Sequence, residues 1–222
     1  MIEKLAKVAK ENNFNVYRIT EICGDKSTTE VITPSNDCNN IYSISKAITS
    51  TALGVLYDEG KISLDDNIYD FFADDYPELD DIWKSVTLHN VLTHTTGIAE
   101  PFLDVDAPVD IIETEGCDDY LKIALNRLPV KTPGTEWNYS DSNYYIISRV
   151  IEKVSGIELE QFLFKHFFRK MKFQSAGFAK CPHGHSMGAT GLFLNTVDLA
   201  KFGKMCLDGG KWEGEQLISK QW

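Results

Sequence analysis

The sequence has few cysteines, and none of them form a pair with the spacing of a metal or redox motif. Its five cysteines, Cys23, Cys38, Cys117, Cys181 and Cys206, are scattered and odd in number, and no C-x-x-C pair occurs. A zinc site or a dithiol redox centre therefore has little support. We expect free thiols in a reducing compartment.

The sequence also lacks an excess of positive charge and long apolar runs. Lys and Arg number 22 against 33 Asp and Glu, a net charge of −11. Nucleic-acid and anionic membrane partners are not expected, because phosphate contacts need clustered Lys and Arg. No stretch approaches the roughly 18 apolar residues of a membrane span. The N-terminal MIEKLAKVAKENN has no apolar signal-peptide core. We expect a cytoplasmic protein.

The patterns that are present predict a small β portion, a central helix and a helical middle. FNVYRITEIC (14–23) and TTEVIT (28–33) are rich in β-forming residues and predict a hairpin. A buried helix is predicted over 41–57, ending near Gly60, which suits a left-handed cap. Thr87 is a plausible N-cap. Further helices are predicted at 87–94, 118–128, 142–154, 157–168 and after an Asn195–Asp198 capping box.

The helix 41–57, IYSISKAITSTALGVLY, contains one charged residue, Lys46. Ser43 precedes it by three positions, so the two side chains share one helix face. Burial disfavours a charged ammonium, and a neutral lysine amine can accept the proton of a serine nucleophile. The alternative is that Lys46 extends to the surface and Ser43 merely begins the helix.

A second polar cluster, Tyr139-Ser140-Asp141, stands directly before the apolar helix 142–154. A tyrosine there can present its hydroxyl to the same site and pass protons between nucleophile and leaving group. An acidic or amide side chain two residues on can bind the lysine or orient a substrate amide. The alternative for the tyrosine is an aromatic anchor that packs the helix.

Five segments in order resemble the serine β-lactamase and penicillin-binding-protein family. They are S-I-S-K (43–46), D-E-G-K-I-S-L-D-D (58–66), L-T-H-T-T-G-I (92–98), P-G-T-E-W-N-Y-S-D (133–141) and G-L-F-L-N-T-V-D-L-A-K-F-G (191–203). The sequence looks most like the branch of class C β-lactamases, D-Ala-D-Ala carboxypeptidases and esterases.

This resemblance implies an α+β fold, with an antiparallel sheet flanked by helices, a mostly helical domain and the site between them. Residues 1–60 and 186–222 would form an incomplete α/β portion, and 61–185 the helical domain. The resemblance makes Ser43 the acylated nucleophile, Lys46 its base partner and Tyr139 the tyrosine of the family's Y-x-N motif. It implies a β-lactam, a D-amino-acid peptide or a small ester as substrate, with neither cofactor nor metal.

Two departures from the family pattern stand out. Position 141 is Asp instead of Asn, so it either favours a charged Lys46 and contacts substrate there, or turns away to cap the following helix. The third family motif, K-T-G or H-x-G, does not occur after 191–203. We therefore expect a chain that lacks the C-terminal part of the family fold. Its unpaired sheet edge would invite self-association, and its catalysis would be weak or absent. The alternative is a non-catalytic binding or sensing protein, or an inactive fragment.

Histidines are the remaining candidates. By the resemblance, His94 lies in a structural turn. His183 and His185 stand near Cys181 and could bind a metal. No further ligand is evident, so we expect no metal site.

Overall fold

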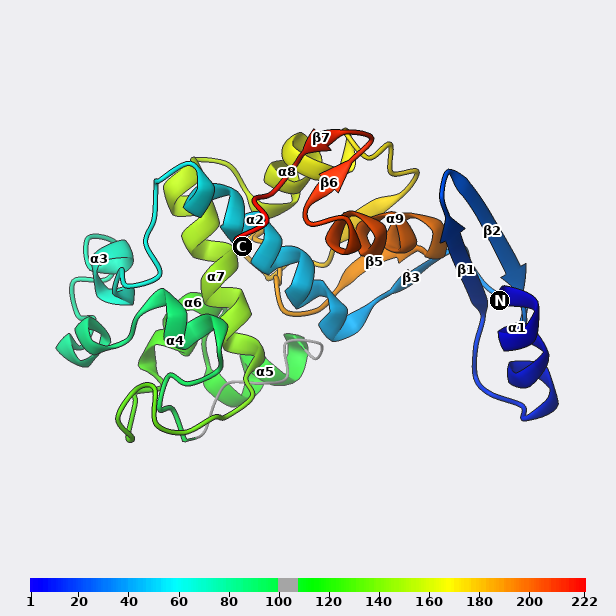
Figure 1. Cartoon of the computed structure of the whole chain (residues 1–222). Coiled ribbons are helices and arrows are strands. Elements are labelled where there is room, and N and C mark those ends of the chain that lie inside the picture. Colours follow the sequence, from blue (N-terminus) through cyan, green and yellow to red (C-terminus); the bar gives the residue numbers. More distant parts are fainter. Residues whose placement is uncertain (100–107) are drawn as a thin grey trace.

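The computed structural model describes residues 1–99 and 108–222, with its elements labelled in Figure 1. The helices are α1 (Ile2–Glu11), α2 (Ser45–Asp58), α3 (Ile68–Phe72), α4 (Leu88–Leu92), α5 (Pro108–Glu115), α6 (Tyr120–Asn126), α7 (Asp141–Ser155), α8 (Leu159–Leu163) and α9 (Thr196–Leu207). The strands are β1 (Arg18–Cys23), β2 (Lys26–Val31), β3 (Cys38–Asn40), β4 (Ala176–Phe178), β5 (Leu192–Asn195), β6 (Lys211–Trp212) and β7 (Glu215–Gln216). Short helical turns are η1 (Tyr42–Ile44), η2 (Asp81–Ser85) and the π-turn η3 (Phe164–Phe168). The predicted α+β class is confirmed.

The N-terminal part is the predicted hairpin, with strand ends that differ from 14–23 and 28–33. β1 and β2 pair antiparallel along their whole length, and Gly24 takes a left-handed φ of 60° in the turn between them. α1 packs on both strands through an apolar side that includes Ile2 and Ala6. Figure 1 shows this unit at one end of the molecule, beside α9. The helix supplies the cover that an isolated hairpin needs.

A second sheet has the antiparallel strand order β3-β5-β4, and β6 and β7 form a separate two-stranded ribbon. β3 leads into η1 and α2, and β5 leads into α9, so this sheet fixes where both helices begin. β4, which lies within the segment predicted as the helical domain (61–185), belongs to this sheet. The division into an α/β portion and a helical domain stays a prediction.

The sheets have edges that no other described strand occupies. In the described ranges, β1 pairs with β2 alone, and β3 and β4 each pair with β5 alone. Self-association through such an edge stays a prediction.

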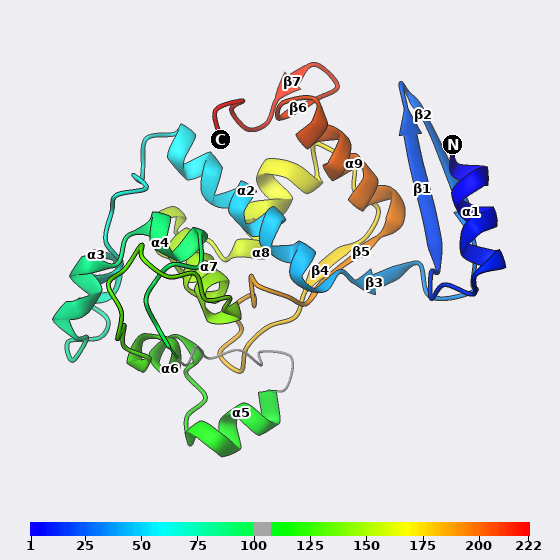
Figure 2. The same ribbon diagram turned by 60° about the horizontal axis from the view of Figure 1, so that its bottom comes forward.

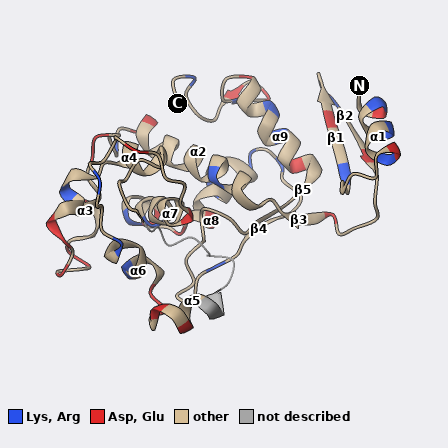
Figure 3. Cartoon of the chain, turned by 90° about the horizontal axis from the view of Figure 1, so that it is seen from below, with Lys and Arg blue, Asp and Glu red and all other residues tan. Residues whose placement is uncertain are grey.

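α2 forms the centre of the core. It packs against α7 and α8, and Figure 2 shows it crossing the middle of the molecule. Ile48 and Leu53 are at most 1% exposed. Apart from Lys46 and Asp58, α2 carries no charge (Figure 3). The predicted burial of this helix is confirmed.

The start of this helix differs from the prediction. The pattern predicts helix from Ile41, whereas α2 begins at Ser45 after the turn η1. Tyr42 has a φ of 48°, which a regular right-handed helix does not allow. The break places Ser43 in the 3-10 turn η1 before α2 instead of within the α-helix.

Polar side chains and glycine mark the ends of several helices. Thr87 and Asn90 form a capping box at α4, and Asn195 Oδ1 accepts a hydrogen bond from Asp198 N at 2.8 Å to cap α9. α7 ends at Gly156, which has a φ of 75°. α4, α6, α7 and α8 with η3 correspond to the helices predicted from the sequence. α7 has 15 residues, and within 1–99 and 108–222 no helix is long and apolar enough to cross a bilayer.

Gly97 provides a test of close packing in the helical part. Its φ is 84°, and a Cβ there would lie 2.2 Å from Lys131 O. Gly97 O also accepts hydrogen bonds from Val130 N at 2.9 Å and Lys131 N at 3.1 Å, so the two segments cannot separate freely. We expect Gly97→Ala to lower the free energy of unfolding in urea by about 2 kcal/mol more than Gly24→Ala does.

Gly24→Ala is the matched control. Gly24 also has a positive φ, but a Cβ there meets nothing within 4 Å. Gly24→Ala should lower the free energy of unfolding by about 1 kcal/mol, which is the cost of a left-handed φ at a residue that has a Cβ. Equal losses in the two variants would contradict the steric explanation.

Candidate active site

Ser43 lies in η1, between β3 and the first turn of α2. The turn is sharp because Tyr42 occupies the left-handed region, which a tyrosine rarely does. Tyr42 N donates to Asn40 Oδ1 at 2.8 Å, which holds the turn. Backbone strain of this kind costs about 1–3 kcal/mol and is concentrated at functional sites. This backbone conformation places Ser43 on an exposed turn at the N-terminal end of α2.

Lys46 lies in the first turn of α2, and its side chain is 8% exposed. Its Nζ donates to Ser43 Oγ at 3.1 Å and to Ala189 O at 3.0 Å. It also lies 2.5 Å from Asp141 Oδ1, an ion pair that lacks the alignment of a hydrogen bond. An ammonium has three N–H donors to direct at three oxygen atoms. Lys46 is therefore buried among acceptors and does not extend to the surface.

Tyr139 completes the cluster. Its hydroxyl oxygen lies 2.6 Å from Ser43 Oγ, although the two residues are 96 positions apart in the sequence. Lys46 Nζ lies 4.7 Å from the centre of the Tyr139 ring. The structure thus brings together the three residues that the sequence selected as catalytic.

Asp141 points into this cluster. Sequence reasoning left open whether it contacts Lys46 or caps α7. Ser140 is the N-cap residue of α7, and no side chain makes a capping hydrogen bond there. Asp141 instead pairs with Lys46, and its side chain is 15% exposed. An acidic group therefore compensates the buried lysine.

His94 supports Tyr139 from the neighbouring turn. It has a φ of 58°, and its ring centre lies 4.8 Å from that of Tyr139. His94 Nδ1 accepts a hydrogen bond from Ser140 N at 3.2 Å, which places the proton of the neutral ring on Nε2. Burial, together with the nearby charge of Lys46, lowers the pKa of His94. This position fits the structural role predicted for it.

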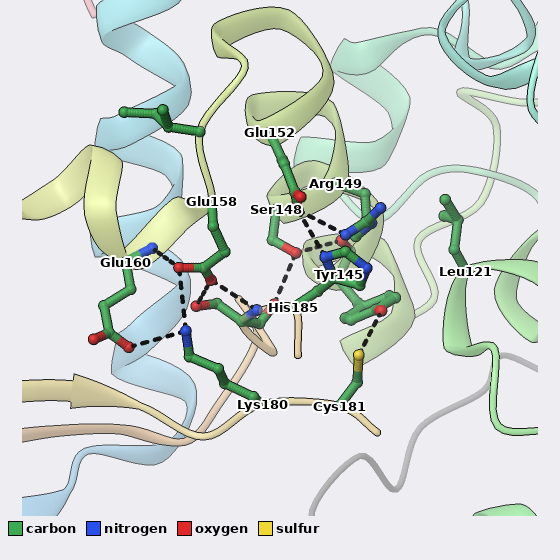
Figure 4. A network of polar contacts seen from close by, with 12 residues as sticks. Leu121, Tyr145, Ser148, Arg149, Glu152, Glu158, Glu160, Lys180, Cys181 and His185 are labelled. Carbon is green, nitrogen blue, oxygen red and sulfur yellow. Dashed lines mark hydrogen bonds and ion pairs between the residues drawn. The ribbon is translucent and has the colours of Figure 1, made fainter. Parts of the chain in front are cut away.

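Loop 185–190 is held by a polar network, part of which Figure 4 shows. The loop supplies one of the three oxygen atoms around Lys46. Glu158, at the start of α8, accepts hydrogen bonds from the hydroxyl of Ser186 and from Ser186 N, the latter at 2.9 Å. Ser148, on α7, donates to Ser186 O at 2.9 Å. The loop is thereby fixed to the two helices that pack against α2.

Sequence reasoning did not identify Ala189, because a main-chain carbonyl leaves no mark in a sequence. The signal that existed was Gly188, which has a φ of 68° and whose Cβ position lies 2.4 Å from Tyr144 O. Gly188 O accepts a hydrogen bond from Thr49 Oγ1 at 2.7 Å. The close contact with α7 requires a glycine at position 188. This glycine in turn directs the carbonyl of Ala189 toward Lys46.

Cys181, His183 and His185 do not share one site. Cys181 Sγ accepts a hydrogen bond from a tyrosine of α7 at 3.2 Å, and His185 pairs with a glutamate of the same helix at 2.9 Å. His183 lies 3.2 Å from Asp118 Oδ1. In the part of the chain that the structure describes, no three His, Cys, Asp or Glu side chains are grouped to hold a metal ion. All five cysteines are free.

A family model described as Beta-lactamase matches residues 24–221. The chain therefore belongs to this family, the group of serine β-lactamases and penicillin-binding-protein-like proteins.

Two curated relatives show the extent of the match. The chain is 29% identical over 205 residues to PbpX of Bacillus subtilis strain 168, provisionally named a penicillin-binding protein, covering 79% of the chain and 48% of PbpX. It is 24% identical over 202 residues to the 6-aminohexanoate-dimer hydrolase of Paenarthrobacter ureafaciens, covering 84% of the chain and 50% of that hydrolase. The chain thus spans about half the length of these relatives.

Solved structures show the same fold. A D-stereospecific amidohydrolase from Streptomyces superimposes with a TM-score of 0.72 at 20% identity. The match covers 98% of this chain and 76% of the amidohydrolase chain.

His94 predicts a dependence of stability on pH. Its pKa in the folded protein lies below the ordinary value of 6.5, through burial and the charge of Lys46. As the pH falls below about 6.5, the unfolded chain binds a proton that the folded chain resists, so stability is lost. The loss ends where folded His94 also binds a proton, and its slope is at most about 1.4 kcal/mol per pH unit.

Urea unfolding between pH 7.5 and pH 5 measures this effect. The unfolding free energy of the wild-type chain should fall more steeply with decreasing pH than that of His94→Gln, which lacks the titrating group. His89→Gln is the control, because His89 is exposed, and it should keep the wild-type slope. Parallel slopes in the wild type and His94→Gln would contradict the assignment.

Proposed function

We propose that the chain is a serine hydrolase that acts on an amide or ester through an acyl-serine intermediate. The observation that carries this proposal is the position of Ser43 Oγ, 2.6 Å from Tyr139 OH and 3.1 Å from Lys46 Nζ. A serine hydroxyl is a weak nucleophile until a neighbouring group takes its proton, and here two such groups lie within hydrogen-bond distance.

The reaction follows from these positions. Ser43 Oγ attacks the carbonyl carbon, a C–O bond forms, and the carbonyl oxygen takes the negative charge. The serine proton passes to whichever of Tyr139 and Lys46 acts as the general base. The bond to the leaving group then breaks, and the leaving group takes that proton. Water attacks the acyl-serine, releases the acid and restores the hydroxyl of Ser43.

The relatives support this reaction class. One is named as a hydrolase of the 6-aminohexanoate dimer, and a structural neighbour as a D-stereospecific amidohydrolase. Penicillin-binding proteins are also among the relatives. The candidate substrates of this chain are a β-lactam, a D-amino-acid peptide and a small ester.

A non-catalytic binding or sensing role, or an inactive fragment, is the second candidate. The observation that favours it is the ion pair of Lys46 with Asp141. A neighbouring carboxylate favours the charged lysine, which cannot accept the serine proton. The chain also spans about half the length of its curated relatives.

Covalent labelling separates these candidates. We expect a fluorophosphonate probe to add one adduct mass to the chain and to leave Ser43→Ala unmodified. Intact-mass measurement, followed by peptide mapping, locates the adduct. Ser27→Ala, which removes an exposed serine of β2, should label like the wild type. A wild-type chain without an adduct, or one labelled equally after Ser43→Ala, would refute the hydrolase proposal.

Tyr139→Phe tests the proton transfer. Losing the hydroxyl should slow labelling of Ser43 by about a hundredfold or more, the usual contribution of a general acid or base. Tyr17→Phe removes the hydroxyl of an exposed tyrosine far from the site in sequence and should keep the wild-type rate. An unchanged labelling rate in Tyr139→Phe would exclude the tyrosine from proton transfer.

A further inference from the structure

Large apolar side chains are exposed around Ser43. Tyr42 and Ile44 flank it in η1 and are 63% and 51% exposed. Trp137 is 67% exposed, and its ring centre lies 6.2 Å from that of Tyr139. We call Tyr42, Ile44 and Trp137 the apolar rim. Exposed apolar side chains thus stand on both sides of Ser43 in sequence and beside its partner Tyr139, where a substrate can contact them.

The charges at the site cancel each other. Of the described residues that contact Ser43 or Tyr139, Lys46 is the cation, and Asp141 pairs with it at 2.5 Å. His94, packed on Tyr139, is neutral near pH 7 because its pKa is lowered. Lys46 Nζ lies 3.1 Å from Ser43 Oγ and 2.5 Å from Asp141 Oδ1. A substrate carboxylate that approaches Ser43 therefore meets a cation whose charge Asp141 already compensates.

We propose that Asp141 and the apolar rim select uncharged, apolar esters or amides at Ser43 and disfavour substrates whose leaving group carries a carboxylate. This inference rests on the proposed hydrolase function. Asp141 compensates the Lys46 charge that would otherwise attract the carboxylate of such a substrate, and the rim removes apolar surface of a neutral substrate from water. Asp141 thereby acts as a specificity-determining residue.

Two esters that differ in one charge test the electrostatic part. 3-Acetoxybenzamide and 3-acetoxybenzoate transfer the same acetyl group, and their phenol leaving groups differ in one carboxylate. The rate of phenol release reports acylation whether or not the acyl group is later hydrolysed. We expect the wild-type chain to prefer the neutral ester, and Asp141→Asn to reduce this preference about tenfold, since the charge of Lys46 is then uncompensated and attracts the anionic ester.

Asp74→Asn is the matched control. Asp74 is exposed and precedes Asp75, which pairs with Lys153 near the opposite end of α7 from Asp141. This variant loses the same charge and should keep the wild-type preference. Far-UV circular dichroism and fluorophosphonate labelling of Ser43 establish that Asp141→Asn is folded with an intact nucleophile.

A comparison of two esters that differ in acyl chain length tests the apolar rim. Phenol release should be faster from the butanoyl ester of 3-hydroxybenzamide than from the acetyl ester in the wild type, and Trp137→Ser should reduce this gain. Leu207→Ser, which removes an exposed leucine at the end of α9, should keep it. Equal gains in the wild type and Trp137→Ser would overturn the role of the rim.

The outcomes distinguish the two proposals. If Ser43 forms no fluorophosphonate adduct and neither ester reacts, the hydrolase function itself fails. If Ser43 is labelled but the wild type prefers the anionic ester, the charge selection is wrong. The charge selection is also wrong if Asp141→Asn keeps the wild-type preference for the neutral ester. It is wrong too if neither ester acylates a chain whose Ser43 reacts with the fluorophosphonate.

Discussion

One buried cation organises this structure. Removing the Lys46 ammonium from water costs several kcal/mol unless it is paired and hydrogen-bonded. Three oxygen atoms compensate it, from Ser43 in η1, Asp141 at the start of α7 and Ala189 in loop 185–190. The central helix, the helical part and the segment that leads into β5 therefore meet at one charge. Removing one acceptor would leave the others around an under-compensated cation.

Much of the fold was readable from local patterns, and the site was readable in part. The spacing of Ser43 and Lys46 is a property of one helix start, so sequence alone could pair them. The proximity of Tyr139 followed from the family resemblance, since 96 residues separate it from Ser43. The Asp141 side chain could either cap α7 or pair with Lys46, and the buried cation determines the outcome. That choice depends on tertiary packing, which local propensity does not contain.

Two further features of the site come from the backbone. The φ of Tyr42 shortens the predicted helix and lifts Ser43 out of it. The carbonyl of Ala189 reaches Lys46 because Gly188 packs against Tyr144 O more closely than any side chain would allow. A hydrophobic pattern predicts the buried body of α2 but neither of these two features, and both lie beside the reactive groups.

The separation of Lys46 from Ala189, 143 residues along the chain, also matters for biosynthesis. The ribosome completes α2 long before it adds loop 185–190. At about 5–20 residues per second, the helix waits on the order of ten seconds for that acceptor. During this interval the cation of α2 lacks its acceptor from the loop, and until α7 and α8 follow, the apolar helix also lacks the helices that cover it. Apolar surface exposed in this way makes a growing chain prone to aggregation.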